Sequence, residues 1–353
     1  MLRWWVALLI PLACGQSLPA LRWVQEIDNL GVDTFTGIGT DAQGNIYVAG
    51  NTTSPNFPVK AAVQSYLASA GLYRIDGTGS AYSRVGSKFV VSRLAADPLN
   101  PNVFYGVSPT SPVKSLDGGN TWTPLSQVSE VWQFAVDPSN DQNVYAAGFD
   151  QGFFKSSDGG ATWNLINNGI TLSEDSLAWG IWIDPNSGVL FGDYGDSVVR
   201  SADGGASWQT VASAYTFTLY FETPKPGVLY IFNGANNVLK STDDGQTFQT
   251  VTIPVTSIFA DPTRAGRLLG NGQGGIFESD DDGVTWALAL PFAGGIAAAD
   301  WANGVLYAYM SAAPGVFQIS SNLKTVTPVG PPGIAATGLV VSNGHVYVPN
   351  SGL

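Results

Sequence analysis

One octapeptide occurs five times along the chain at nearly constant spacing. The clearest copy reads Ser-Ser-Asp-Gly-Gly-Ala-Thr-Trp, and the five copies span residues 115–122, 156–163, 201–208, 241–248 and 279–286. A motif that returns about every 40 residues predicts a repeat architecture in which each copy belongs to one supersecondary unit.

Each octapeptide has the composition of a hairpin turn between two strands. An apolar run that ends in a long polar residue, such as Phe153-Phe154-Lys155, precedes it. The aspartate can accept backbone N–H bonds inside the turn, glycine can adopt positive φ, and the final aromatic ring can pack between sheets. We therefore expect a structural role for Asp117, Asp158, Asp203, Asp243 and Asp281, and for Trp122, Trp163, Trp208, Phe248 and Trp286.

These octapeptides resemble the Asp-box of the BNR repeat family, S-x-D-x-G-x-T-W. Sialidases, sortilin-type receptors, xyloglucan-cleaving enzymes and a photosystem assembly factor share that motif on β-propellers. The resemblance implies a propeller with the boxes at the blade periphery, away from the ligand face. It does not imply a function, because the family hosts many.

A second resemblance lies near the N-terminus, where residues 41–58 are similar to a bacterial β-propeller repeat of the SBBP type (D-x-x-G-N-x-Y-V-x-G-x-T-x-S-x-x-F-P). Similar strand starts recur through the chain, at Asp41, Asp97, Asp137, Asp184, Pro224, Asp261, Asp300 and Ser342. We therefore predict an all-β fold: a single β-propeller with eight blades, whose closing blade combines Leu21–Glu26 with the segment after Ser342. The alternative is seven blades, with the C-terminal stretch folded into the first blade.

The composition agrees with an exported all-β protein, which we expect to be a monomer. Only 12% of residues are charged, which argues against long helices. The net charge is −12, which argues against nucleic acid or an anionic membrane as partners. Residues 1–15 have the pattern of a signal peptide, so we expect the propeller to span 16–353 and the protein to be secreted, periplasmic or at the cell surface. Cleavage after Gly15 is favoured, and lipidation of Cys14, which would anchor the chain without membrane insertion, is the alternative.

The residue counts exclude several kinds of chemistry. His345 is the single histidine and Cys14 the single cysteine, so neither a serine–histidine triad nor a usual zinc site is predicted. Runs such as Asp280-Asp281-Asp282 lack the glutamate that closes an EF-hand loop, and the repeat explains them. We predict no metal and no cofactor. Sialidase activity is not predicted either, because the arginine entry motif of that family is absent.

Candidate site residues lie on the loops that propeller topology places opposite the octapeptides. The catalytic candidates are four carboxylates, Glu174, Asp175, Asp193 and Asp196, and the ligand-binding candidates are Glu130, Trp132, Trp179 and Tyr194. Carboxylates beside exposed aromatic rings suit the recognition of a glycan or a protein. The competing interpretation is that the carboxylates are solvated loop residues and that the tryptophans open buried strands. We expect a non-catalytic binding or scaffold protein, with a glycoside hydrolase or lyase as the alternative.

Overall fold

The computed structural model describes most of the chain after residue 32. The described residues are 33–40, 46–52, 71–75, 82–86, 91–108, 110–171, 177–213, 218–221, 225–232, 238–291, 296–302, 305–310, 315–330, 334, 336, 338–342 and 344–350. The chain divides into two compact units, Met1–Leu67 and Ala68–Leu353. Each is described by itself.

The first unit contains an antiparallel hairpin, β1 (Asp33–Thr40) and β2 (Ile46–Thr52). Its pairing shifts register between Phe35 and Gly37, so that Thr36 is left out of the ladder, and then continues to Thr40, just before Asp41. The Trp23 segment that we expected in a closing blade lies outside the described residues.

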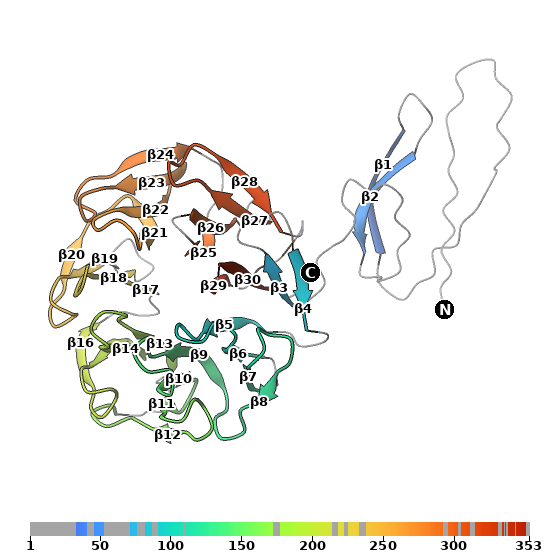
Figure 1. The fold of residues 1–353 in the computed structure, drawn as a ribbon. Helices are drawn as coiled ribbons and strands as arrows, with labels where there is room; N and C mark the ends of the chain where they lie inside the picture. Colours follow the sequence, from blue (N-terminus) through green and yellow to red (C-terminus); the bar gives the residue numbers. More distant parts are fainter. Residues whose placement is uncertain are drawn as a thin grey trace, which may run out of the picture. The chain divides into compact units, whose positions relative to one another are not determined.

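The second unit is a ring of seven four-stranded antiparallel sheets, or blades, within the described residues (Figure 1). The first three blades are blade 1, β5 (Arg93–Ala96), β6 (Phe104–Val107), β7 (Pro112–Ser115) and β8 (Thr123–Pro124); blade 2, β9 (Val131–Val136), β10 (Val144–Gly148), β11 (Gly152–Ser156) and β12 (Asn164–Leu165); and blade 3, β13 (Ala178–Ile183), β14 (Leu190–Tyr194), β15 (Ser197–Ser201) and β16 (Gln209–Ser213).

The next three blades have the same strand order. They are blade 4, β17 (Thr218–Phe221), β18 (Leu229–Phe232), β19 (Val238–Ser241) and β20 (Gln249–Val251); blade 5, β21 (Val255–Ala260), β22 (Leu268–Gly272), β23 (Gly275–Ser279) and β24 (Ala287–Pro291); and blade 6, β25 (Ile296–Ala302), β26 (Val305–Met310), β27 (Gly315–Ile319) and β28 (Val326–Val329).

The closing blade combines strands from opposite ends of the ring unit. Its order is β29 (Val340–Ser342), β30 (His345–Asn350), β3 (Gly71–Ile75) and β4 (Tyr82–Val85), with Tyr73 paired to Val348 across the junction. The ring of described strands therefore has seven blades, the alternative count, rather than the favoured eight. The reason is that β3 and β4 already provide the two outer strands that the C-terminal pair requires.

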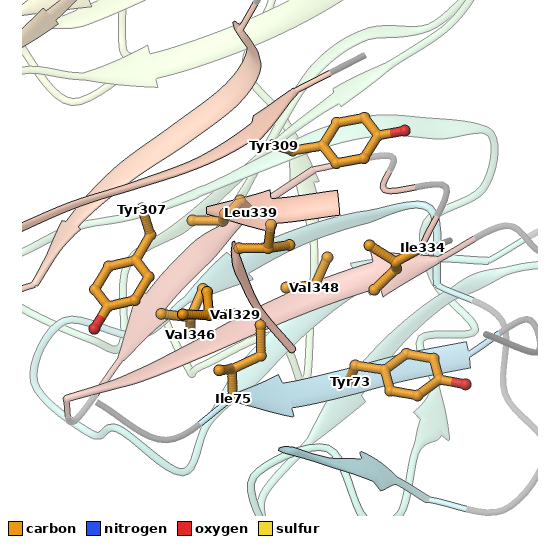
Figure 2. Close-up of a cluster of buried hydrophobic side chains, with 10 residues drawn as sticks. Tyr73, Ile75, Tyr307, Tyr309, Val329, Ile334, Leu339, Val346 and Val348 are labelled. Atoms are coloured by element: carbon orange, nitrogen blue, oxygen red, sulfur yellow. The ribbon is translucent and has the colours of Figure 1, made fainter. Parts of the chain in front are cut away.

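Buried side chains fill the spaces between neighbouring blades. One cluster joins blade 6 to the closing blade, and Figure 2 shows Val329, Val346 and Ile75 gathered within it. Another joins the closing blade to blade 1 through Leu72, Tyr347 and Phe104, which completes the circle. Because the second strand of each blade is buried on both faces, the ring is stabilised mainly by contacts between blades.

Each blade presents two different ends to the faces of the ring. In blade 2, Val144 pairs with Ser156, so the octapeptide lies at the same end as the turn between β9 and β10. Val131 and Gly148 pair at the opposite end. We call the octapeptide end the turn face and the end where inner strands begin the start face. The strand pairing thus confirms that the loops entering each blade open opposite the octapeptides.

Candidate functional site

On the turn face, the octapeptides form closed hydrogen-bond networks. Ser156 Oγ donates to Asp158 Oδ1 at 2.7 Å and accepts a bond from the Gly160 N–H at 2.7 Å. The backbone N–H of Thr162 donates to the first oxygen of Asp158, and its hydroxyl donates to the second at 2.6 Å. The other four copies repeat this network. Both carboxylate oxygens are thus engaged within the turn.

These bonds stabilise the charged form of the octapeptide aspartates. Those from the threonine or serine four residues later act most strongly, and the pKa falls to about 2 for Asp158, Asp203, Asp243 and Asp281. The pKa of Asp117 is lowered for the same reason. Among the described residues, no group of three or more histidine, cysteine, aspartate or glutamate side chains could hold a metal ion.

In four of the five copies, the long polar residue before the octapeptide contacts the next blade, whereas Glu278, before the fifth, pairs with Arg267. Lys114 Nζ and the Tyr105 hydroxyl both donate to the carbonyl of Gly159, at 2.6 and 2.8 Å. Lys155 reaches the carbonyl of Gly204 in the same way. Arg200 donates to the backbone carbonyl of Asp244, and Lys240 donates to that of Asp282. The sequence showed that a long polar residue recurs there but not what it binds, because the acceptor lies on another blade.

On the start face, a β-bulge recurs near the beginning of the inner strand. In blade 2 the pairing passes from Val131 to Gln133, so Trp132 is left out of the ladder. In blade 3 it passes from Ala178 to Gly180, which leaves out Trp179. Blades 5 and 6 have the same shift one residue after the strand begins. A bulge turns a side chain away from the ladder and is common beside functional sites.

The two bulged tryptophans meet in one aromatic cluster, which also includes Phe149. The ring centroids of Trp132 and Trp179 lie 5.2 Å apart with planes at 84°, and those of Phe149 and Trp179 lie 5.1 Å apart at 90°. Such edge-to-face contacts are the favoured geometry of aromatic pairs. All three side chains are only partly buried. We call Trp132, Phe149 and Trp179 the aromatic cluster.

Backbone bonds hold the loops beneath the aromatic cluster together. The Phe149 N–H donates to the carbonyl of Glu130 at 2.9 Å, and the Ala178 N–H donates to the carbonyl of Phe149 at 3.1 Å. Glu130 has a φ of 50°, a left-handed conformation that is uncommon outside glycine. The cluster therefore has a fixed base that links blades 2 and 3.

Arg93, at the start of β5, extends the aromatic cluster into blade 1. Its guanidinium carbon lies 4.3 Å from the ring centroid of Trp132, and its Nη1 donates to the Trp132 carbonyl at 3.4 Å. Arg93 remains exposed to solvent. The neighbouring ring displaces part of its water shell, and this desolvation lowers its pKa. We call Arg93 together with the aromatic cluster the start-face site.

The described carboxylates predicted on this face differ in their exposure to solvent. Glu130 and Asp196 are exposed, whereas Asp193 is buried on β14. Glu174 and Asp175 lie outside the described residues. Tyr194 is buried against Phe153 and donates its hydroxyl to the Thr171 carbonyl at 3.3 Å. Trp132 and Trp179 were predicted from the sequence, whereas no sequence signal marks Phe149 or Arg93.

A hollow of about 550 Å³ opens between β5 and β29. Its lining includes Leu94, Pro98, Val340 and Asp97, whose first carboxylate oxygen accepts the backbone N–H groups of the second and third residues after it. In the described chain, no helix is long and apolar enough to span a membrane.

Comparisons with known proteins agree with this fold. A family model described as a β-propeller repeat matches residues 22–58, and no curated protein matches the chain. The Niastella koreensis GH74 enzyme superimposes with a TM-score of 0.59 at 20% identity, covering 88% of this chain and 56% of that enzyme. This chain thus spans little more than half the length of that enzyme.

Two further solved structures are similar. YCF48 from Cyanidioschyzon merolae has a TM-score of 0.54 at 12% identity, covering 80% of this chain and 99% of that one. The extracellular domain of a one-component system from B. thetaiotaomicron has a TM-score of 0.56 at 10% identity, covering 76% of this chain and 38% of that one. At these identities the similarity shows the fold alone: the chain is a β-propeller.

Proposed function

We propose that the protein is a non-catalytic binding propeller, which recognises a glycan or a protein surface through the start-face site. The observation that carries this proposal is the pair of partly exposed tryptophans, Trp132 and Trp179, held beside Arg93. Aromatic rings with a few directed polar groups on a rigid scaffold are the usual composition of a recognition surface. The ring supplies that rigidity through contacts on both sides of every blade.

The hydrolase alternative requires two carboxylates placed across a substrate, roughly 5 to 10 Å apart. The described candidates differ in environment, since Asp193 is buried and Asp196 is exposed. No observation on the described residues favours this alternative, so our proposal is based on the aromatic cluster. We also propose that the protein acts outside the cytoplasm, on the evidence of the signal-like residues 1–15.

A binding screen with matched tryptophan variants tests the proposal. Residues 16–353 are applied to a glycan array and to a panel of extracellular proteins, together with Trp132→Ala, Trp179→Ala and the turn-face control Trp163→Ala. We expect a ligand whose binding falls at least tenfold in the first two variants and persists in the control. Equal loss in all three variants, or no ligand at all, would contradict the proposal. Release of new reducing ends from a bound glycan would favour the hydrolase instead.

A further inference from the structure

Arg93 differs from Arg264 and Arg267, which pair with carboxylates, and resembles Arg200, whose bond goes to the backbone carbonyl of Asp244. Arg267 pairs with Asp261 at 2.9 Å and with Glu278 at 2.7 Å, and Arg264 pairs with Asp280 at 2.8 Å. Arg93 has no carboxylate partner among the described residues, and its contacts are the ring and the carbonyl of Trp132. Arg93 therefore presents a positive charge on the start face of a chain whose net charge is −12.

The geometry of Arg93 leaves its donors accessible to a ligand. A guanidinium has five N–H groups in one plane, and the bond to the Trp132 carbonyl uses one of them, at a long distance of 3.4 Å. Contact with the indole holds the group in place, so little side-chain freedom is lost when an anion binds. Two parallel N–H groups can then take the two oxygens of one carboxylate.

The neighbouring tryptophans specify what that carboxylate is attached to. The guanidinium carbon of Arg93 lies over the Trp132 ring, 4.3 Å from its centre, and Trp179 extends the aromatic surface into blade 3. The C–H face of a sugar can pack on such rings while a carboxylate at its edge meets the arginine. A peptide chain would match the carboxylate contact but does not require a second flat ring.

The overall charge limits how many anionic groups the ligand carries. Densely charged polyanions need several cations on the protein, and the described part of the start-face site offers Arg93 alone. A sparsely charged glycan, with one carboxylate among neutral sugars, is compatible with an acidic protein because long-range repulsion is weak at physiological salt.

We infer that the start-face site binds an acidic glycan, in which a uronic acid places its carboxylate on Arg93 and sugar rings pack on Trp132 and Trp179. This inference rests on the proposed function and specifies its ligand. It assigns Arg93 the role of distinguishing acidic from neutral glycans. The tryptophans contribute to the binding of both acidic and neutral glycans.

The test uses pairs of glycans that differ only in the carboxylate. The probes are a xylo-oligosaccharide with one glucuronic acid branch against the unbranched oligosaccharide, and a galacturonate oligomer against its methyl ester. Affinities are measured by calorimetry for residues 16–353, for Arg93→Gln and Arg93→Lys, and for Arg264→Gln, which removes the same charge from an exposed ion pair on the turn face. Thermal melting verifies that each variant is folded.

We expect at least one acidic probe to bind more tightly than its neutral counterpart. Arg93→Gln should weaken the acidic probe about 10- to 100-fold, the range for a hydrogen-bonded charge, and leave the neutral probe unchanged. Arg93→Lys should recover part of the loss, and Arg264→Gln should have no effect.

Three results would overturn the inference. The first is failure of both acidic probes to bind, and the second is equal binding within each pair. The third is binding of a peptide through its carboxylate instead of a glycan. If a neutral glycan or a protein binds and depends on Trp132 but not on Arg93, the proposed function survives and only this inference fails. If nothing binds through Trp132, both fail.

Discussion

Replacing Trp208 by alanine tests whether the last residue of the octapeptide joins neighbouring blades. Its side chain is 3% exposed, and its ring stacks on Phe153 of blade 2 at a centroid distance of 4.8 Å. Its indole N–H donates to the carbonyl of Ile166 at 2.6 Å. Trp163, by contrast, is only partly buried and donates to Gly160 within its own turn.

The expected loss of stability in Trp208→Ala follows from these contacts. Removing a fully buried tryptophan costs about 3 to 5 kcal/mol, so we expect Trp208→Ala to destabilise by that amount. At about 2 °C per kcal/mol for a domain of this size, Tm should fall by roughly 6 to 10 °C. Trp163→Ala should cost about half as much because less surface leaves water when that ring packs. Trp208→Phe keeps an aromatic ring but removes the donor to Ile166, and should cost about 1 to 3 kcal/mol.

The assay is thermal melting followed by circular dichroism, with urea unfolding as a second measure. The expected order of Tm is unaltered chain, Trp163→Ala, and then Trp208→Ala as the least stable. Equal shifts for the two alanine variants, or a shift below about 2 °C for Trp208→Ala, would refute the reasoning that burial between blades determines the cost.

Two further predictions concern the turns. The folded pKa of Asp158 is about 2 and its unfolded value is about 4, so the stability that its charged form contributes is complete above pH 4 and is lost as the pH falls towards 2. The midpoint of urea unfolding should therefore fall over that pH range, and should fall less steeply in Asp158→Asn. A midpoint that does not change with pH would contradict this prediction. In the same assay, Gly169→Ala should destabilise the protein more than Gly188→Ala. Both glycines have positive φ, but only a Cβ added at residue 169 would lie 2.3 Å from a backbone oxygen, that of Trp208. Similar losses of stability in the two variants would show that the cost comes from the positive φ alone.

The sequence predicted what is local in this fold and missed what is not. The octapeptide turn could be foreseen because its serine, aspartate and threonine bond to one another within seven residues. The blade count could not, since it depends on β30 pairing with β3 across almost the whole ring unit. The β1–β2 hairpin contributed to the error: its register shift and the Asp41 that follows match the inner strand pairs of the blades.

The start-face site was predictable only in part. Trp132 and Trp179 could be named because they open the inner strands after long loops. Their contact with each other depends on a bulge in each of two blades, and such bulges have no reliable sequence signature. Phe149 lies in the hairpin turn after β10, and Arg93 lies in blade 1. Only packing of the ring brings them to the tryptophans.

Footprinting of the bound ligand tests most directly whether recognition occurs on the start face. Backbone hydrogen exchange is measured for residues 16–353, with and without the tightest ligand from the binding screen. The account predicts protection at the beginnings of β5, β9 and β13 and around Phe149, with the octapeptides unchanged. Protection confined to the octapeptides, with none around Trp132 and Trp179, would contradict it.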